Sequence, residues 1–358
     1  MNLLLPLLLA CGGAEEPPAP SAALTGGAAA DAVPAPTPAA AGPTPIRIGW
    51  QTTWATQGQL VAVLQHTDIL EKNGFLPDWK AFTYGGPLNE GALAGAVDVL
   101  FTADQPALVL AAKDSSWGIV GRLMYNRVGA FVPADSAVQT AGDLRGKTLA
   151  VPFGAAAQRE ALEGAQAAGL DPAKDLTLVN LGIEEILGVV RAGAKDGRWG
   201  TIDAAAAWDP TFAEIERAGG ARTIVSSVVT SVVVMDDAFS AHHPGADARF
   251  LTALAMAWDV YRADPARADR WFKEDAKLPF EAEVLTVAAS VEPNLKGTTA
   301  DIRIHLDDAD VAGIVEAGAF MEKAGLLKVP LAVDGVIRPV ARAPLAAPVD
   351  TTAVVVRP

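Results

Sequence analysis

The sequence predicts an α/β fold, and three observations support this prediction. Short apolar runs alternate with segments of helical spacing from residue 46 to about 328, the pattern of strands joined by helices around a mostly parallel sheet. Turns that contain Gly or Pro separate these segments, for example at 84–87. Hydrophobic residues make up 51% of the 358 residues, enough for a sizeable core, and this length suits about two domains.

The first half of the folded body alternates strands with helices. Because the carboxyl ends of parallel strands share one edge, we expect the loops at 51–57, 84–87 and 102–105 on one rim, where ligands bind in open α/β sheets. Asp104 has a second interpretation, as N-cap of a helix that starts at Pro106. The expected strands are 46–50, 78–83, 97–101, 117–123 and 127–132, and the expected helices are 58–70, 88–94 and 106–113.

The stretch 148–165 predicts a strand, a tight turn and a helix. Pro152 ends the apolar strand, Gly154 permits the turn, and the following residues favour a helix. The first N–H groups of such a helix have no internal partner and can face a ligand, although an ordinary strand-to-helix corner would look the same. Beyond it we expect strands at 176–180, 202–208, 221–225 and 228–235, helices at 184–192, 247–261, 265–276, 279–290 and 307–325, and a mostly irregular tail after 329.

Charge and residue usage exclude several classes of function. The formal net charge is -14, so the basic footprint of a nucleic-acid-binding protein is absent. The four histidines have no metal-ligand spacing, and neither a Gly-x-Ser-x-Gly motif nor a phosphate-binding loop is present. We therefore expect no catalytic residues, no metal and no cofactor.

The N-terminus predicts export and anchoring. Residues 3–10 form an apolar run that is too short to span a bilayer but suits a signal peptide. The sequence Leu-Leu-Ala-Cys that ends at Cys11 resembles a bacterial lipobox, although the basic residues that usually precede the apolar run are missing. We expect a lipoprotein signal peptide at 1–11, lipidation of Cys11, and a disordered tether rich in Ala and Pro at 12–45.

Several stretches in order resemble the solute-binding proteins of ABC transporters, and more narrowly the nitrate/sulfonate/taurine-binding group. The segment Asp-Leu-Arg-Gly-Lys at 143–147, followed by a strand and a glycine turn, is the most specific. The other matching stretches are 46–53, 84–86, 94–103, 202–204 and 208–210. Together they cover about residues 46 to 210.

This resemblance implies a type II periplasmic binding fold, in which two lobes joined by two hinge crossings close over a ligand in the cleft between them. We expect crossings near 132–133 and 228–234, lobe 1 at 46–132 plus 234–328, and lobe 2 at 133–233. The resemblance also implies capture of a ligand and its delivery to an ABC permease. We expect the ligand to be a small organic molecule, either sulfonate-like or taurine-like, an amine, or another nitrogen or sulfur compound. The net charge favours a monomer, and the lipidated Cys11 would anchor it to the membrane in the periplasm or on the cell surface.

The same resemblance and the loop positions select the residues expected to bind the ligand. Trp54, Asp104, Trp208 and Asp209 each have a structural alternative, as core or turn residues. Arg122 and Arg127 lie near the first crossing and suit either an anion clamp or a structural salt bridge. The predicted ligand-binding residues are Gln51, Thr53, Trp54, Gly85, Gly86, Asp104, Gln105, Phe153, Gly154, Ala155, Trp208 and Asp209.

Residues 155–157 are all alanine, whereas sulfonate-binding relatives often carry Ser or Thr at this helix start. If Asp104, Asp209 or the glutamates at 184–185 face the cleft, the site is negatively charged and favours a cationic, zwitterionic or apolar ligand over nitrate or sulfate. Two other functions stay open. One is a ligand-binding subunit of a sensor or lipid-handling pathway. The other is an enzyme similar to those of thiamine pyrimidine synthesis, whose cysteine-rich signature this chain lacks.

Overall fold

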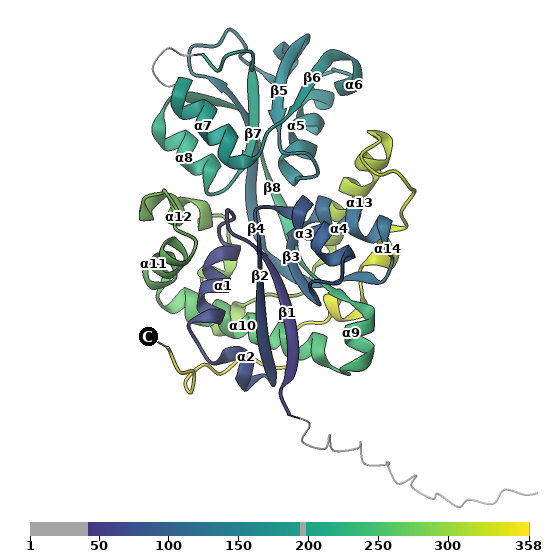
Figure 1. The fold of residues 1–358 in the computed structure, drawn as a ribbon, viewed down its shortest axis with the longest axis vertical. Helices are drawn as coiled ribbons and strands as arrows, with labels where there is room; N and C mark the ends of the chain where they lie inside the picture. Colours follow the sequence, from purple (N-terminus) through teal and green to yellow (C-terminus); the bar gives the residue numbers. More distant parts are fainter. Residues whose placement is uncertain (1–41, 194–197, 358) are drawn as a thin grey trace, which may run out of the picture. The chain divides into compact units, whose positions relative to one another are not determined.

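The computed structural model describes residues 42–193 and 198–357, in which eight strands form one mixed sheet in the order β2-β1-β3-β8-β4-β7-β5-β6 (Figure 1). The predicted signal peptide, Cys11 and the tether up to residue 41 lie outside the described residues. The strands are β1 Thr44–Gln51, β2 Phe75–Phe82, β3 Val99–Ala103, β4 Trp117–Pro133, β5 Lys147–Val151, β6 Leu176–Asn180, β7 Ala204–Trp208 and β8 Ala221–Asp236.

Helices pack around this sheet throughout the described chain, so the predicted α/β class is confirmed (Figure 1). None of the helices in the described residues is long and apolar enough to cross a membrane. The helices are α1 Gln57–Gln65, α2 Ile69–Lys72, α3 Gly85–Leu93, α4 Asp104–Lys113, α5 Ala156–Ala167, α6 Pro172–Asp175, α7 Ile183–Gly193, α8 Thr211–Ala218, α9 Asp237–His242, α10 Ala246–Ala263, α11 Pro265–Asp275, α12 Ala282–Ala289, α13 Asp308–Lys323 and α14 Val333–Val336.

The sheet is parallel only toward its two ends. Strand β1 pairs in parallel with β2 and β3, and β5 pairs in parallel with β6 and β7. In the centre β4 and β8 run antiparallel to each other, and they also pair antiparallel with β7 and β3, respectively. The expectation of a mostly parallel sheet is therefore wrong for the centre. We call the β1–β3 end lobe 1 and the β5–β7 end lobe 2.

Strands β4 and β8 are each one long strand where the sequence predicted two. The two expected strands 117–123 and 127–132 left residues 124–126 unassigned, but the ladder continues through them, because Met124, Tyr125 and Asn126 each pair with a residue of β8. The same holds for Ser226 and Ser227, which pair back onto β4. Cross-strand pairing thus outweighs the low strand preference of single polar residues.

These two strands carry the chain between the lobes. Strand β4 pairs with β7 of lobe 2 at residues 128–131, and β8 pairs with β3 of lobe 1 at residues 231–235. The change of lobe therefore falls near residues 125–127 in β4 and 228–230 in β8. The expected crossings at 132–133 and 228–234 lie on these same two strands, and the expected lobe boundaries stay a prediction.

The core of lobe 1 shows why its strands form. In β3, Val99 and Phe101 contact one apolar cluster, whereas Leu100 between them contacts another. Val233 and Val234 of β8 divide in the same way. This alternation buries both faces of the sheet, one under α1, α10 and α11 and the other under α3, α4 and α13 (Figure 1).

The C-terminal part contains one confirmed helix and a partly ordered tail. The helix expected at 307–325 is present as α13. Asp307 caps it by accepting from the Asp310 N–H at 2.9 Å, and Gly325 follows it with a φ of 70°. The tail after residue 329 is largely irregular but includes α14. It packs on lobe 1, where Ala341 is fully buried and the Arg338 N–H donates to the Ile119 carbonyl.

Candidate functional site

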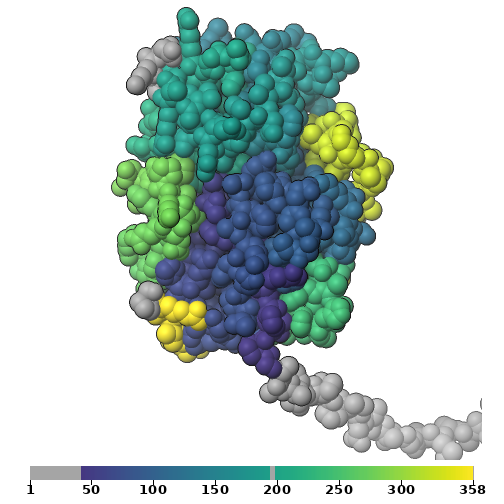
Figure 2. All heavy atoms as spheres, in the orientation of Figure 1, coloured from purple at the N-terminus to yellow at the C-terminus, as the bar shows by residue number. Residues whose placement is uncertain are grey.

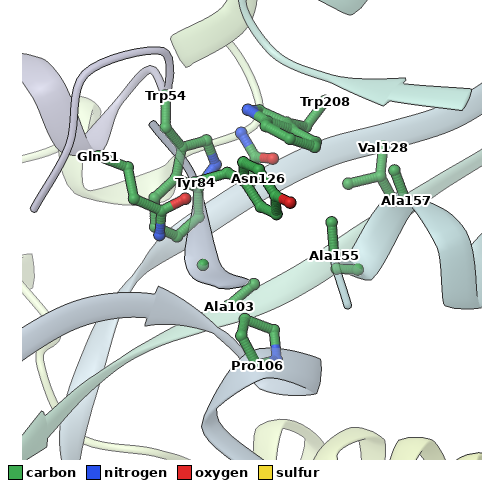
Figure 3. Close-up of a pocket in the computed structure, with 12 residues that line it drawn as sticks. Gln51, Trp54, Tyr84, Ala103, Pro106, Asn126, Val128, Ala155, Ala157 and Trp208 are labelled. Atoms are coloured by element: carbon green, nitrogen blue, oxygen red, sulfur yellow. The ribbon is translucent and has the colours of Figure 1, made fainter. Parts of the chain in front are cut away.

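A narrow cavity that is partly open to solvent lies where the two lobes meet, and the space inside it holds little more than one water molecule. On the face shown in Figure 2, residues of lobe 2 (teal) meet residues of lobe 1 (blue) without a wide opening. Both lobes and the crossing strand β4 line the cavity (Figure 3). Its lining residues are Gln51, Trp54, Tyr84, Gly85, Ala103, Pro106, Asn126, Val128, Ala155, Ala156, Ala157 and Trp208.

The sheet places this cavity at the carboxyl ends of its strands. Gln51, Ala103 and Trp208 are the last residues of β1, β3 and β7. Ala155 follows the end of β5 by four residues. Ligands in open α/β sheets bind at this edge, so the expectation of loops gathered on one rim agrees with the topology.

Aromatic rings form much of the wall. Tyr84 of lobe 1 and Trp208 of lobe 2 lie with ring centroids 6.4 Å apart at an interplanar angle of 44°, and Trp54 is almost completely buried beside them (Figure 3). The Trp208 Nε1–H donates to the Thr53 carbonyl across the lobe boundary at 3.2 Å. These rings offer apolar surface to the carbon part of a ligand.

Two side-chain amides add polar groups. The Gln51 Nε2–H donates to the Phe101 carbonyl at 3.1 Å, and the Asn126 Nδ2–H donates to the Ala55 carbonyl at 2.9 Å. The amide nitrogens are thus engaged with the backbone. The side-chain oxygens of Gln51 and Asn126 are the groups that can accept a hydrogen bond from a ligand.

Helix N-termini from both lobes reach the cavity. Helix α3 begins at Gly85 and α5 at Ala156, and neither has a side-chain cap. The first N–H groups of a helix lack an internal acceptor and carry partial positive charge. Gly85 is required by packing as well, because a Cβ there would lie 2.8 Å from the Pro106 ring. The two helix ends can therefore donate to one anionic or strongly polar group.

No charged side chain lines this cavity within the part of the chain that the structure describes. Asp104 pairs with Arg159 at 2.5 Å, and Asp209 pairs with Arg127 at 2.8 Å. Burial raises the pKa of both carboxyls, although each arginine opposes the shift. The expectation of a negatively charged site fails in this cavity, because these carboxylates are turned to arginines.

The glutamates weighed in the charge argument also lie elsewhere. Glu185 accepts from the Gly182 N–H at 2.7 Å, and Glu184 lines a separate groove beside α7. Arg127 bonds Asp209 and Glu216, and Arg122 bonds Glu292, so the structural interpretation of both arginines is confirmed.

Five predicted ligand-binding residues line the cavity and seven lie beside it. Thr53 donates through Oγ1 to the Thr83 carbonyl, Phe153 is 43% exposed, and Gly154 makes the expected tight turn with a φ of 81°. Whether any of the twelve contacts a ligand stays a prediction. Those in the lining are Gln51, Trp54, Gly85, Ala155 and Trp208, and those outside it are Thr53, Gly86, Asp104, Gln105, Phe153, Gly154 and Asp209.

Asp104 is not the N-cap of α4, because Ala103 has that position and Asp104 is the first helical residue. Sequence reasoning also missed Asn126 and Val128, which the crossing strand β4 supplies. Asn126 could have been selected from the sequence, because it is an amide side chain within a long, mostly apolar stretch. Tyr84 and Ala103 are adjacent to the predicted residues Gly85 and Asp104. The sequence did not show that the side chains of Tyr84 and Ala103 line the cavity.

These observations define a two-lobe fold of the periplasmic binding protein type, with a candidate ligand cavity between the lobes. A model of the NMT1/THI5-like family matches residues 88–268, just over half of the chain, so the chain belongs to this family. A protein of Brachyspira hyodysenteriae that is assigned as an ABC transporter periplasmic binding protein is 28% identical over 221 residues. The match covers 55% of this chain and 60% of that relative's length.

Solved structures share the fold at low identity. The alkanesulfonate-binding protein SsuA of Xanthomonas axonopodis pv. citri, bound to MOPS, is 21% identical with a TM-score of 0.68, covering 85% of this chain and 100% of that chain. The aliphatic sulphonate-binding protein SsuA of Escherichia coli is 19% identical with a TM-score of 0.67, covering 84% and 94%. The desulfurization enzyme DszB also has this fold, at 17% identity and a TM-score of 0.57 over 82% and 96%.

Proposed function

We propose that this protein is an extracytoplasmic solute receptor that captures a small organic molecule by lobe closure and delivers it to an ABC importer. One observation carries the proposal. The cavity between the lobes combines two uncapped helix N-termini, three aromatic rings and no charged side chain of the described residues. Such a cavity recognises a small ligand and offers no group for catalysis.

The ligand class follows from these groups. The helix ends favour an anionic headgroup such as a sulfonate, the oxygens of Gln51 and Asn126 favour an amine or hydroxyl on the same ligand, and the rings favour a carbon chain. A taurine-like or alkyl sulfonate has this combination. The sulfonate-binding proteins that share the fold support this class, and the uncharged lining weakens the argument for a cation.

Nitrate and sulfate remain excluded in this proposal, because they have no carbon to cover Trp54, Tyr84 and Trp208. Anchoring of the receptor through lipidated Cys11 and a periplasmic location also remain part of it. Fatty-acid labelling that is lost on Cys11→Ser tests the anchor. A sensor role stays possible on the same cavity, whereas an enzyme would need a reactive group that the described lining lacks.

A thermal-shift screen tests the proposed function. The panel contains taurine, alkyl sulfonates, MOPS, nitrate, sulfate, betaines and polyamines. We expect a sulfonate to raise the melting temperature by several degrees, since a ligand at a hundred times its Kd stabilises the fold by about 2.7 kcal/mol. Nitrate, sulfate and polyamines should give no shift. Stabilisation by polyamines alone would contradict the proposed ligand class.

A further inference from the structure

Directly behind the cavity wall, an ion pair joins the two lobes. Asp104 is the first residue of α4 in lobe 1, next to the lining residue Ala103. Arg159 of α5 in lobe 2 follows the lining residue Ala157 by two positions. The Arg159 Nη2–H donates to the Asp104 Oδ2 at 2.5 Å, and both side chains are at least 95% buried.

Arg159 has more carboxylate partners than one cation can neutralise. On its own helix it also pairs with Glu160 at 2.7 Å and with Glu163 at 3.1 Å. Glu316 of α13 lines the same cavity as this cluster, whereas the β8 segment 227–230 there contributes no titratable group. Three carboxylates therefore pair with one guanidinium, and the Glu316 side chain lines the cavity beside them.

Separation of the lobes changes this cluster in one way. Arg159, Glu160 and Glu163 all belong to α5 and stay together. Among the three carboxylates that pair with Arg159, Asp104 is the one that leaves with lobe 1, where it loses Arg159 and gains solvent. Closure thus brings a third carboxylate into a buried site that already holds two carboxylates beside its arginine.

We propose that Asp104 is the positioning residue that couples lobe closure to ligand capture, and that closure takes up a proton into the carboxylate cluster around Arg159. The inference rests on the proposed capture by closure. Pairing with Arg159 sets the start of α4 against the start of α5, so that the Ala103 and Ala157 walls of the cavity face each other. A proton on the cluster removes the repulsion that the third carboxylate brings.

The local electrostatics agree with this inference. Burial raises the pKa of Asp104. The nearby Arg159 opposes this shift, and the Glu160 carboxylate adds to it. Burial raises the pKa of Glu163 in the same way. Burial alone would lower the pKa of Arg159, but the surrounding carboxylates outweigh it and keep this side chain charged. The extra proton belongs to the coupled carboxylates rather than to one of them.

The pKa of Asp104 differs between the open and the closed form. In the open form Asp104 regains an ordinary pKa near 4, below its raised pKa in the closed form. Lowering the pH through the closed-state pKa therefore favours closure, by up to about tenfold per pH unit for each proton taken up. The effect ends below the open-state pKa, where both forms are protonated.

Two measurements on the full chain test the inference. Ligand-free closure is measured between spin labels at exposed Ala81 and Ala137, one in each lobe, in a Cys11→Ser background. We expect the closed fraction to rise from pH 8 to pH 5, and Asp104→Asn to abolish at least half of this rise. Calorimetry with the tightest sulfonate, in buffers of different ionisation enthalpy, should show proton uptake that Asp104→Asn reduces.

Glu214→Gln is the matched control, since Glu214 is a buried carboxylate that pairs with Arg191 and Arg217 within lobe 2. It should change neither the pH profile nor proton uptake. A closed fraction independent of pH, or an unchanged slope in Asp104→Asn, would overturn the inference. Because the label distances need no ligand, a failed sulfonate screen would count against the proposed function and leave this test intact.

Discussion

Replacing Ala156 with Asp is expected to weaken sulfonate binding at least about 100-fold. Ala156 is the first residue of α5 and lines the cavity. A carboxylate about 4 Å from the bound anion repels it by about 4 kcal/mol at an effective dielectric constant near 20, and each tenfold loss of affinity is about 1.4 kcal/mol. Helix α5 itself should tolerate the change, because Asp is favourable in a first helical turn.

Ala156→Asn is the matched control, with nearly the same shape and no charge. The ratio of the Kd values of the two variants, measured by calorimetry, isolates the charge from the crowding of the cavity. An anionic ligand requires Asn to bind more tightly than Asp. Tighter binding to the Asp variant would mean that the ligand is cationic and that the helix ends do not bind its headgroup.

Loss of the Glu292 side chain is expected to lower the free energy of unfolding by about 3–5 kcal/mol. Glu292 and Arg122 are fully buried, and the carboxylate accepts from both terminal nitrogens of Arg122 at 2.9 and 3.0 Å. It also accepts from the Tyr125 N–H at 2.7 Å, next to the crossing of β4. Glu292→Ala leaves the buried Arg122 guanidinium without its counterion. The expected loss is a large share of the stability of a typical domain.

Urea unfolding at equilibrium measures this loss. Glu90→Ala serves as the control, because Glu90 is mostly exposed and its pair with Lys113 lies at the surface. Exposed pairs contribute about 1 kcal/mol or less. Equal losses in the two variants would show that the Arg122–Glu292 pair does not hold the crossing strand as described.

Local patterns predicted much of this fold. The β3 strand, the glycine turn at Gly154 and the helix at 307–325 depend on neighbours within a few residues, and each appears close to where it was expected. The long central strands depend on pairing between residues about 100 positions apart, for example Asn126 with Val229. No local pattern reports such a partner, so β4 and β8 were divided at their polar residues.

For the site, the sequence predicted the positions at strand ends but not the direction of the charged side chains. Gln51 and Trp208 end strands, and the topological rule for α/β sheets selects such positions. The direction of Asp104 and Asp209 could not be predicted, because it depends on Arg159 and Arg127 in other elements. That error gave the cavity a negative charge that its described lining lacks, and with it the preference for a cationic, zwitterionic or apolar ligand.

The central claim is that a ligand headgroup binds between the helix ends of the two lobes. Backbone amide resonances of Gly85, Ala156 and Ala157, recorded while the tightest sulfonate is added, test it most directly. We expect these three amides to show large downfield proton shifts together, because each becomes an N–H donor to an anion. Shifts confined to other residues, such as those that line the groove around Glu184 of α7, would contradict binding between the helix ends.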